Sequence, residues 1–318
     1  MTRPAAIDIS DIHVLDGAIA TELERRGCDL SGPLWSGRIL DEAPATIAAV
    51  HLDYLRAGAD CISTASYQVS AHGYRELGVD PAAARRAADR ALRVSLEIAQ
   101  QAQTEYARES ARPVRIAASL GPYGAALHNG AEYHGRYALS FDDLIAFHAE
   151  RLALFAGTSA DLIAFETIPS LEEARAILHA LEETPTLAAW ISFTCRDSLH
   201  VAHGEPLHAC AELLSESPQI AAIGINCTSP ALIDALIIEA RLGSREKKPV
   251  LVYPNSGETW NAANRAWQGY SDPSDYGVLA RNWFATGAQA VGGCCRTRPA
   301  HIAAVAAAAR DAFSPGSS

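Results

Sequence analysis

The stretch Asp16-Gly17-Ala18-Ile19-Ala20 decides between the two folds that the rest of the chain allows. It follows the first predicted strand, where an open nucleotide-binding sheet usually carries the phosphate-binding turn G-x-G-x-x-G. The stretch contains a single glycine and therefore lacks this turn. We expect a closed barrel of parallel strands instead of an open doubly wound sheet.

Eight apolar runs rich in β-branched residues alternate with helical patterns, as the buried strands of a parallel sheet do. They cover residues 13–16, 61–66, 115–119, 162–165, 187–193, 221–225, 250–253 and 290–291. No long linker or change of composition divides them. The sequence therefore predicts an α/β protein with a single (β/α)8 TIM barrel over residues 1–313 and a disordered tail over residues 314–318.

The segments between these runs carry signals of helix ends. Pro44 predicts a helix start and Gly58 predicts its end. Asp272 before Pro273 predicts an N-cap, and Pro299 opens the last helix.

Composition excludes several classes of function. A formal net charge of -11, with scattered basic residues, argues against nucleic-acid binding, which needs clustered Lys and Arg. No run approaches the roughly 18 apolar residues of a membrane span. Residues 1–10 lack an export signal, so we expect a cytoplasmic protein whose seven cysteines are thiols or thiolates instead of disulfides. The sequence does not predict the oligomeric state.

Polar residues and cysteines follow most of the predicted strands, and in a barrel these positions share one face, where barrel enzymes carry out their chemistry. They are Asp16, Tyr67, Glu166, Asn226, Cys227, Asn255, Cys294 and Cys295. The longer segments 121–140 and 254–271 follow the third and seventh strands and could cover this face as lids.

The stretch Gly292-Gly293-Cys294-Cys295 carries the strongest chemical signal. Adjacent cysteines rarely form an unstrained disulfide with each other, but both can turn toward one metal ion. Cys227 would add a third thiolate for Zn2+ and leave the fourth tetrahedral position open for a substrate thiol. The alternative is that these cysteines are small buried hydrophobic residues. We adopt that interpretation for Cys61, Cys195 and Cys210, while Cys28 stays unassigned.

Flanking motifs decide between these interpretations, because together they resemble the homocysteine S-methyltransferase family across nearly the whole chain. They are LDG at 15–17, TEL at 21–23, TASYQ at 64–68, SLGPYG at 119–124, ET at 166–167, GINC at 224–227, VYPNSGE at 252–258 and GGCCRT at 292–297. The chain is most similar to the stand-alone members that use S-methylmethionine, and sometimes S-adenosylmethionine, as methyl donor. The resemblance implies zinc on Cys227, Cys294 and Cys295.

The resemblance also implies sites for the acceptor. It places Asp16 and Glu166 near the amino group of homocysteine, and backbone amides around Gly17 near its carboxylate. An ammonium ion taken from water needs such carboxylates around it. Without the resemblance, Asp16 is a turn residue and Glu166 a charge at a helix N-terminus.

Two further groups of residues have alternative roles. Asn226 and Asn255 could bind substrate, orient the zinc ligands or only satisfy loop hydrogen bonds. Tyr67, Trp35 and Tyr253 could face a sulfonium by cation-π attraction or simply pack in the core.

The predicted reaction is zinc-dependent methyl transfer from a sulfonium donor to the thiol of homocysteine, which forms methionine. One alternative is a selenocysteine or selenohomocysteine methyltransferase, because a selenol meets the same chemistry. Another is a non-catalytic, zinc-binding barrel that senses redox state through its cysteines. A betaine donor is disfavoured because Thr167 follows Glu166. We expect no further cofactor domain, since the chain stops after its eighth predicted helix.

Overall fold

The computed structural model of the chain describes residues 8–31, 34–261, 266–268 and 271–314. Residues 315–318 of the predicted tail lie outside the described residues, as do residues 1–7 of the N-terminal segment used to predict a cytoplasmic location. None of the described helices is long and apolar enough to cross a membrane.

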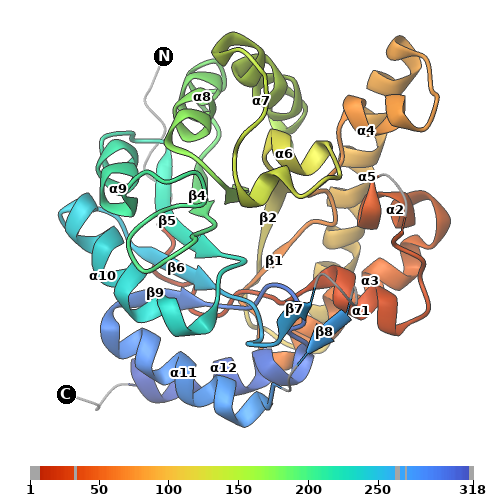
Figure 1. The fold of residues 1–318 in the computed structure, drawn as a ribbon. Coiled ribbons are helices and arrows are strands. Elements are labelled where there is room, and N and C mark those ends of the chain that lie inside the picture. Colours follow the sequence, from red (N-terminus) through yellow and green to blue (C-terminus); the bar gives the residue numbers. More distant parts are fainter. Residues whose placement is uncertain (1–7, 32–33, 262–265, 269–270, 315–318) are drawn as a thin grey trace.

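The centre of the molecule is a curled parallel sheet of seven strands, in the order β1-β2-β3-β4-β5-β6-β9. The strands are β1 (Cys61–Ser63), β2 (Arg115–Leu120), β3 (Leu162–Ile168), β4 (Ala189–Phe193), β5 (Ile220–Asn226), β6 (Val250–Tyr253) and β9 (Ala288–Val291). Sequential strands are neighbours, so every crossover runs in the same direction around the sheet (Figure 1).

Residues 13–16, predicted as the first strand, form no regular strand. Val14 instead makes an isolated parallel bridge to Val291 of β9, and Leu15 makes one to Cys61 of β1. The amides of His13 and Val14 bond the side chain of Asp60, at 3.0 and 2.9 Å. A carboxylate thus replaces a backbone acceptor for these two amides, whereas the amides of Leu15 and Asp16 donate to the carbonyls of Val291 and Cys61 at 2.9 and 3.1 Å.

Most helices lie outside the sheet (Figure 1). The α-helices are α1 (Ile19–Arg25), α2 (Ile39–Glu42), α3 (Pro44–Ala57), α4 (Ala71–Glu76), α5 (Pro81–Tyr106), α6 (Tyr123–Ala126), α7 (Phe141–Phe155), α8 (Leu171–Glu182), α9 (Leu207–Ser215), α10 (Ile233–Ser244), α11 (Pro273–Thr286) and α12 (Pro299–Phe313). Three 3-10 helices are η1 (Trp35–Arg38), η2 (Ala131–Tyr133) and η3 (Pro230–Leu232). The helix starts at Pro44 and Pro299 and the N-cap Asp272 are confirmed, and Gly58 ends α3 at a φ of 113°.

Two hydrophobic clusters hold the fold together. The larger one fills the space between the sheet and the helices. The smaller one takes alternate residues of the strands together with Ile9 and Ile12, and five of its thirteen buried residues are alanines. Its two large aromatic residues meet where the indole of Trp190 donates to the hydroxyl of Tyr253, which in turn donates to Ser192. Tyr253 is therefore a core residue, and this interior packing keeps the sheet curled.

Several boundaries differ from the predicted ones. The strand starting at Cys61 ends at Ser63, because the amide of Ser119 donates to the hydroxyl of Thr64 at 2.9 Å instead of to a backbone carbonyl of that segment. The predicted lid 254–271 contains a hairpin of β7 (Thr259–Asn261) and β8 (Ala266–Gln268), and the predicted lid 121–140 contains α6 and η2. Residues 262–265 and 269–270 of the first lie outside the described residues.

Candidate metal centre

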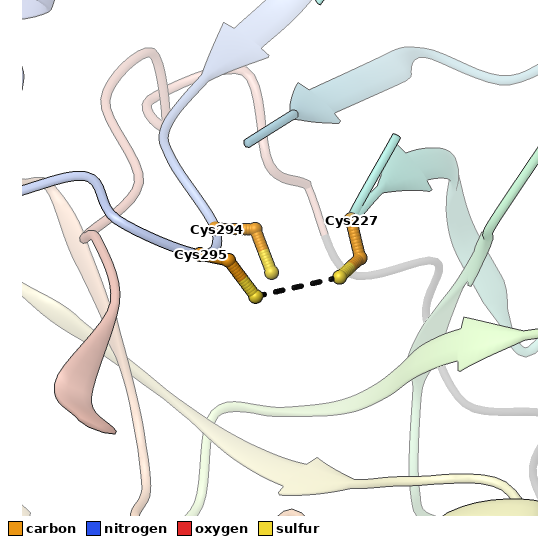
Figure 2. Close-up of side chains that lie close together, drawn as sticks. All are labelled: Cys227, Cys294 and Cys295. Atoms are coloured by element: carbon orange, nitrogen blue, oxygen red, sulfur yellow. Dashed lines mark hydrogen bonds between the residues drawn. The ribbon is translucent and has the colours of Figure 1, made fainter. Parts of the chain in front are cut away.

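Three cysteines from two distant parts of the chain meet at the carboxyl edge of the sheet. The sulfurs of Cys227, Cys294 and Cys295 all lie within 4.8 Å of one another (Figure 2). The sulfurs of Cys227 and Cys295 lie 3.6 Å apart. Cys227 is buried and the other two are half-buried. The predicted convergence is confirmed, and these three thiols could hold one metal ion.

The local backbone conformation orients the side chains of these three cysteines. Cys227 directly follows β5 and has a φ of 50°, in the left-handed region, which turns its side chain out of the strand register. Gly292 and Gly293 follow β9, and neither has space for a side chain. A Cβ on Gly292 would lie 2.8 Å from the carbonyl oxygen of Asp16, and one on Gly293 would lie 2.4 Å from Oγ1 of Thr297. The glycines thus allow the cysteine turn to pack against the loop after residue 15.

The cluster contains unequal thiols. Hydrogen bonds with Cys227 and Cys295, together with burial, raise the pKa of the Cys294 thiol well above its usual value. The bonds that Cys295 makes with the other two thiols lower its own pKa. A divalent cation would favour the thiolate of all three, since thiolates are the form that binds metal. The donor set therefore fits a borderline-soft ion such as zinc.

The carboxyl groups of Asp16, which is buried, and Glu166, which is half-buried, interact with each other beside this cluster. Burial raises the pKa of Asp16 to about 7, and the amide of Ser63 donates to its carboxylate at 2.8 Å. Burial, followed by the negative charge of Asp16, raises the pKa of Glu166 to about 8. Oε1 of Glu166 is buried without a hydrogen-bond partner among the described residues. The pair is arranged to receive a cation.

Asn226 positions Glu166 through the next residue. Its side chain accepts from the amide of Thr167 at 2.8 Å and donates to Oγ1 of Thr167 at 2.9 Å. Thr167 has a φ of 62°, which is unfavourable for a β-branched residue, and the register of β3 shifts between Phe165 and Ile168. Asn226 is fully buried, and these contacts orient the end of β3 instead of the predicted metal ligands; its contact with substrate stays a prediction.

The remaining predicted residues lie around the same edge. Tyr67 is half-buried and lies edge-on to Trp35, with 6.5 Å between ring centroids. Oδ1 of Asn255 is buried without a partner among the described residues. Gly17 packs against Tyr54, because a Cβ there would lie 2.8 Å from that ring. Their contacts with substrate stay predictions.

Sequence reasoning missed two residues of the segment 121–140. The hydroxyl of Tyr133 lies 3.4 Å from the sulfur of Cys227. Its neighbour Glu132 is buried, and burial raises the pKa of that carboxyl to about 7. The one available signal was an acidic and an aromatic residue inside a segment rich in glycine and alanine.

A buried polar network anchors the segment. Glu173 of α8 accepts from the amide of Tyr123 at 2.7 Å, from Nε2 of His148 at 3.0 Å and from the hydroxyl of Tyr137. Arg151 of α7 donates to Nδ1 of His148 at 3.0 Å. Because Nδ1 accepts a hydrogen bond, the proton of His148 is on Nε2, and the imidazole is neutral. Glu173 and Arg151 are thus the two charges of the network.

We expect the stability of the metal-free protein to fall as pH rises between about pH 5 and 8. The folded-state pKa values of Asp16 and Glu166, about 7 and about 8, lie above those of an unfolded chain. Each carboxyl therefore favours the folded state in acid and loses this contribution as pH rises through its folded pKa. Urea unfolding of chelator-treated protein at several pH values measures the effect. Glu166→Gln should flatten the slope, and parallel curves for variant and wild type would contradict the assignment.

The curled α/β sheet and the thiol cluster at its carboxyl edge define a protein with a thiolate-type metal site. A family model described as homocysteine S-methyltransferase matches residues 13–309. The chain therefore belongs to the homocysteine S-methyltransferase family, and the resemblance predicted from its motifs is confirmed.

Individual relatives are similar over nearly their whole length. Homocysteine S-methyltransferase YbgG of Bacillus subtilis is 48% identical over 309 residues, which cover 96% of each chain. A selenocysteine Se-methyltransferase of Brassica oleracea is 38% identical over 92% of this chain and 87% of that protein. The crystal structure of the metallated form of the Escherichia coli homocysteine methyltransferase MmuM superposes with a TM-score of 0.79, at 40% identity, and covers 93% of this chain and 96% of that one.

Proposed function

We propose that this protein transfers a methyl group from a sulfonium donor, S-methylmethionine or S-adenosylmethionine, to the sulfur of homocysteine, with zinc held by Cys227, Cys294 and Cys295. The observation that carries the proposal is three converging thiols beside two carboxyl groups whose pKa values are raised by burial, all at one sheet edge. Family membership supports the same reaction.

The cysteine set fits zinc, which prefers thiolate sulfur and tetrahedral geometry. Three protein ligands leave one position for a substrate sulfur. When bound, zinc lowers the pKa of that thiol, so that the nucleophilic thiolate is present near neutral pH.

The other residues of the edge bind and orient the acceptor. Asp16 and Glu166 pair with its ammonium group, which offsets the cost of ionising two carboxyl groups whose pKa values are raised by burial. Backbone amides around Gly17 receive its carboxylate. Asn226 keeps Glu166 in place through Thr167, and we propose that Tyr67 and Asn255 contact the bound substrates.

The acceptor thiolate attacks the methyl carbon of the donor in line. A carbon-sulfur bond forms as the carbon-sulfonium bond breaks, and its electron pair moves to the donor sulfur. The products are methionine and the demethylated, neutral donor. One negative and one positive charge cancel, so alignment and exclusion of water matter more than a general base.

The reaction is tested by incubating purified protein with homocysteine and S-methylmethionine, S-adenosylmethionine or betaine side by side. We expect methionine from a sulfonium donor and none from betaine. Protein that contains about one zinc but forms no methionine with either sulfonium would overturn the proposal.

Two alternatives have specific support. The selenocysteine Se-methyltransferase relative favours a selenol acceptor, and competition between homocysteine and selenocysteine distinguishes the two substrates. The distance of 3.6 Å between the sulfurs of Cys227 and Cys295 favours a redox sensor, for which oxidation would change metal content without any turnover.

The architecture carries related proposals. We infer that residues 1–313 form one (β/α)8 barrel, in which Val14 and Leu15 stand in for an eighth strand between β9 and β1. The two parallel bridges of these residues support this closure. The disordered tail and the cytoplasmic location stay predictions.

A further inference from the structure

The segment η2 brings the carboxyl group of Glu132 close to the metal centre. Neither the metal nor the acceptor uses this carboxyl group in the proposed function. The hydroxyl of Tyr133 lies 3.4 Å from the sulfur of Cys227, so η2 lies directly over the thiols. Close packing of α6 fixes the neighbouring residue, because a Cβ on Gly124 would lie 2.5 Å from the amide nitrogen of Glu132. The backbone of Glu132 is therefore held at the mouth of the site.

The side chain of Glu132 lacks a compensating charge. It is 9% exposed, and its Oε2 has no hydrogen-bond partner among the described residues. The groups that interact with it electrostatically are Cys227, Cys295 and Tyr67, all of them acids. Burying a carboxylate without a cationic partner costs several kcal/mol, so this arrangement is suited to a cation that arrives from outside.

The metal and the acceptor do not supply that cation. The ligand atoms that lie within 4.8 Å of one another belong to the three cysteines, and Glu132 is outside that group. The ammonium of the acceptor has its own pair of acids, Asp16 and Glu166. The remaining cations belong to the methyl donor, which carries an α-ammonium and a sulfonium. Of the two, the sulfonium must approach the sulfurs beside which Glu132 lies.

We propose that Glu132 is a specificity-determining residue that pairs with the sulfonium cation of the methyl donor. This inference rests on the proposed function and adds the donor side of the site. The donor loses its positive charge as the methyl group leaves, so the attraction is stronger in the bound donor than in the transition state. Glu132 therefore acts mainly on donor binding, and less on the rate of the chemical step.

The test compares wild type with Glu132→Gln and Glu132→Met, two neutral variants of similar length. We expect the KM for S-methylmethionine to rise about tenfold or more, while the KM for homocysteine and kcat change less than about threefold. Calorimetric titration of S-methylmethionine into zinc-loaded protein should show the same loss of affinity without turnover. Glu97→Gln, which removes an exposed carboxyl on α5, is the matched control.

The outcomes separate this inference from the proposed function. Wild-type protein that forms no methionine contradicts the function itself. Active wild type with an unchanged donor KM in both neutral variants overturns the role of Glu132. An equal rise of both KM values, or a lowered melting temperature that accounts for the loss, also overturns it, because the residue would then be structural. Glu132→Asp, which keeps the charge, should restore most of the donor affinity.

Discussion

Replacing Cys295 by alanine is expected to remove the bound metal and to lower methyl transfer by at least about a thousandfold. Cys295 has the lowest thiol pKa of the cluster, since both neighbouring thiols favour its thiolate, and its sulfur lies 3.6 Å from that of Cys227. Without it, two thiols remain, and the acceptor thiol loses the metal that makes it a nucleophile. Zinc content by mass spectrometry and methionine formation measure the two effects together.

Cys210→Ala is the matched control for this prediction. Cys210 is fully buried in α9, away from the thiol cluster, so its loss removes a sulfur without touching the site. The control should keep its metal and at least about half of its activity, because Cys to Ala in a core leaves only a small cavity. A Cys295→Ala protein that still binds about one zinc and turns over normally would exclude the three-thiol site.

The cysteine site could be predicted because its geometry follows from strand order. In a curled parallel sheet the ends of β5 and β9 reach the same edge, so Cys227 and the Cys294-Cys295 pair had to approach each other. The choice between a metal site and small buried hydrophobic cysteines came from the flanking motifs of the family. Asp16 and Glu166 were expected at that edge from the predicted strand ends, whereas their roles toward the acceptor came from the family resemblance and stay predictions.

Other features depend on contacts that no sequence pattern encodes. Residues 13–16 make isolated bridges in place of a regular strand, and the side chain of Asp60 binds two of their amides. The left-handed backbone of Thr167 is held by Asn226, 59 residues further along the chain. Glu132 is held near the thiols because Gly124 packs closely against its backbone. Both residues lie in a segment that the sequence pattern predicts only as a loop.

The buried network around Glu173 leads to the second large effect. Glu173 is completely buried and accepts three hydrogen bonds, two of them from residues at either end of the segment that carries η2. Its negative charge balances the positive charge of Arg151. Burial lowers the pKa of Arg151 to about 9, and at this value the guanidinium is still protonated at neutral pH. The neutral imidazole of His148 connects the two charges. The network therefore holds the segment 121–140, which carries η2, next to the thiol cluster. It also stabilises the fold.

We expect Glu173→Ala to lower the free energy of unfolding by about 3 to 5 kcal/mol, because it leaves the guanidinium of Arg151 as an unpaired buried charge. The neighbouring variant Glu172→Ala removes an exposed carboxyl from the same helix and should cost less than about 1 kcal/mol. Urea unfolding of both zinc-loaded proteins gives the comparison. Since Tyr123 and Tyr137 lose their common acceptor, Glu173→Ala should also raise the KM of the methyl donor through Glu132 on the released segment. Equal stability of the two variants would show that the charges of Glu173 and Arg151 are compensated elsewhere, and that the segment over the thiols is held by other contacts.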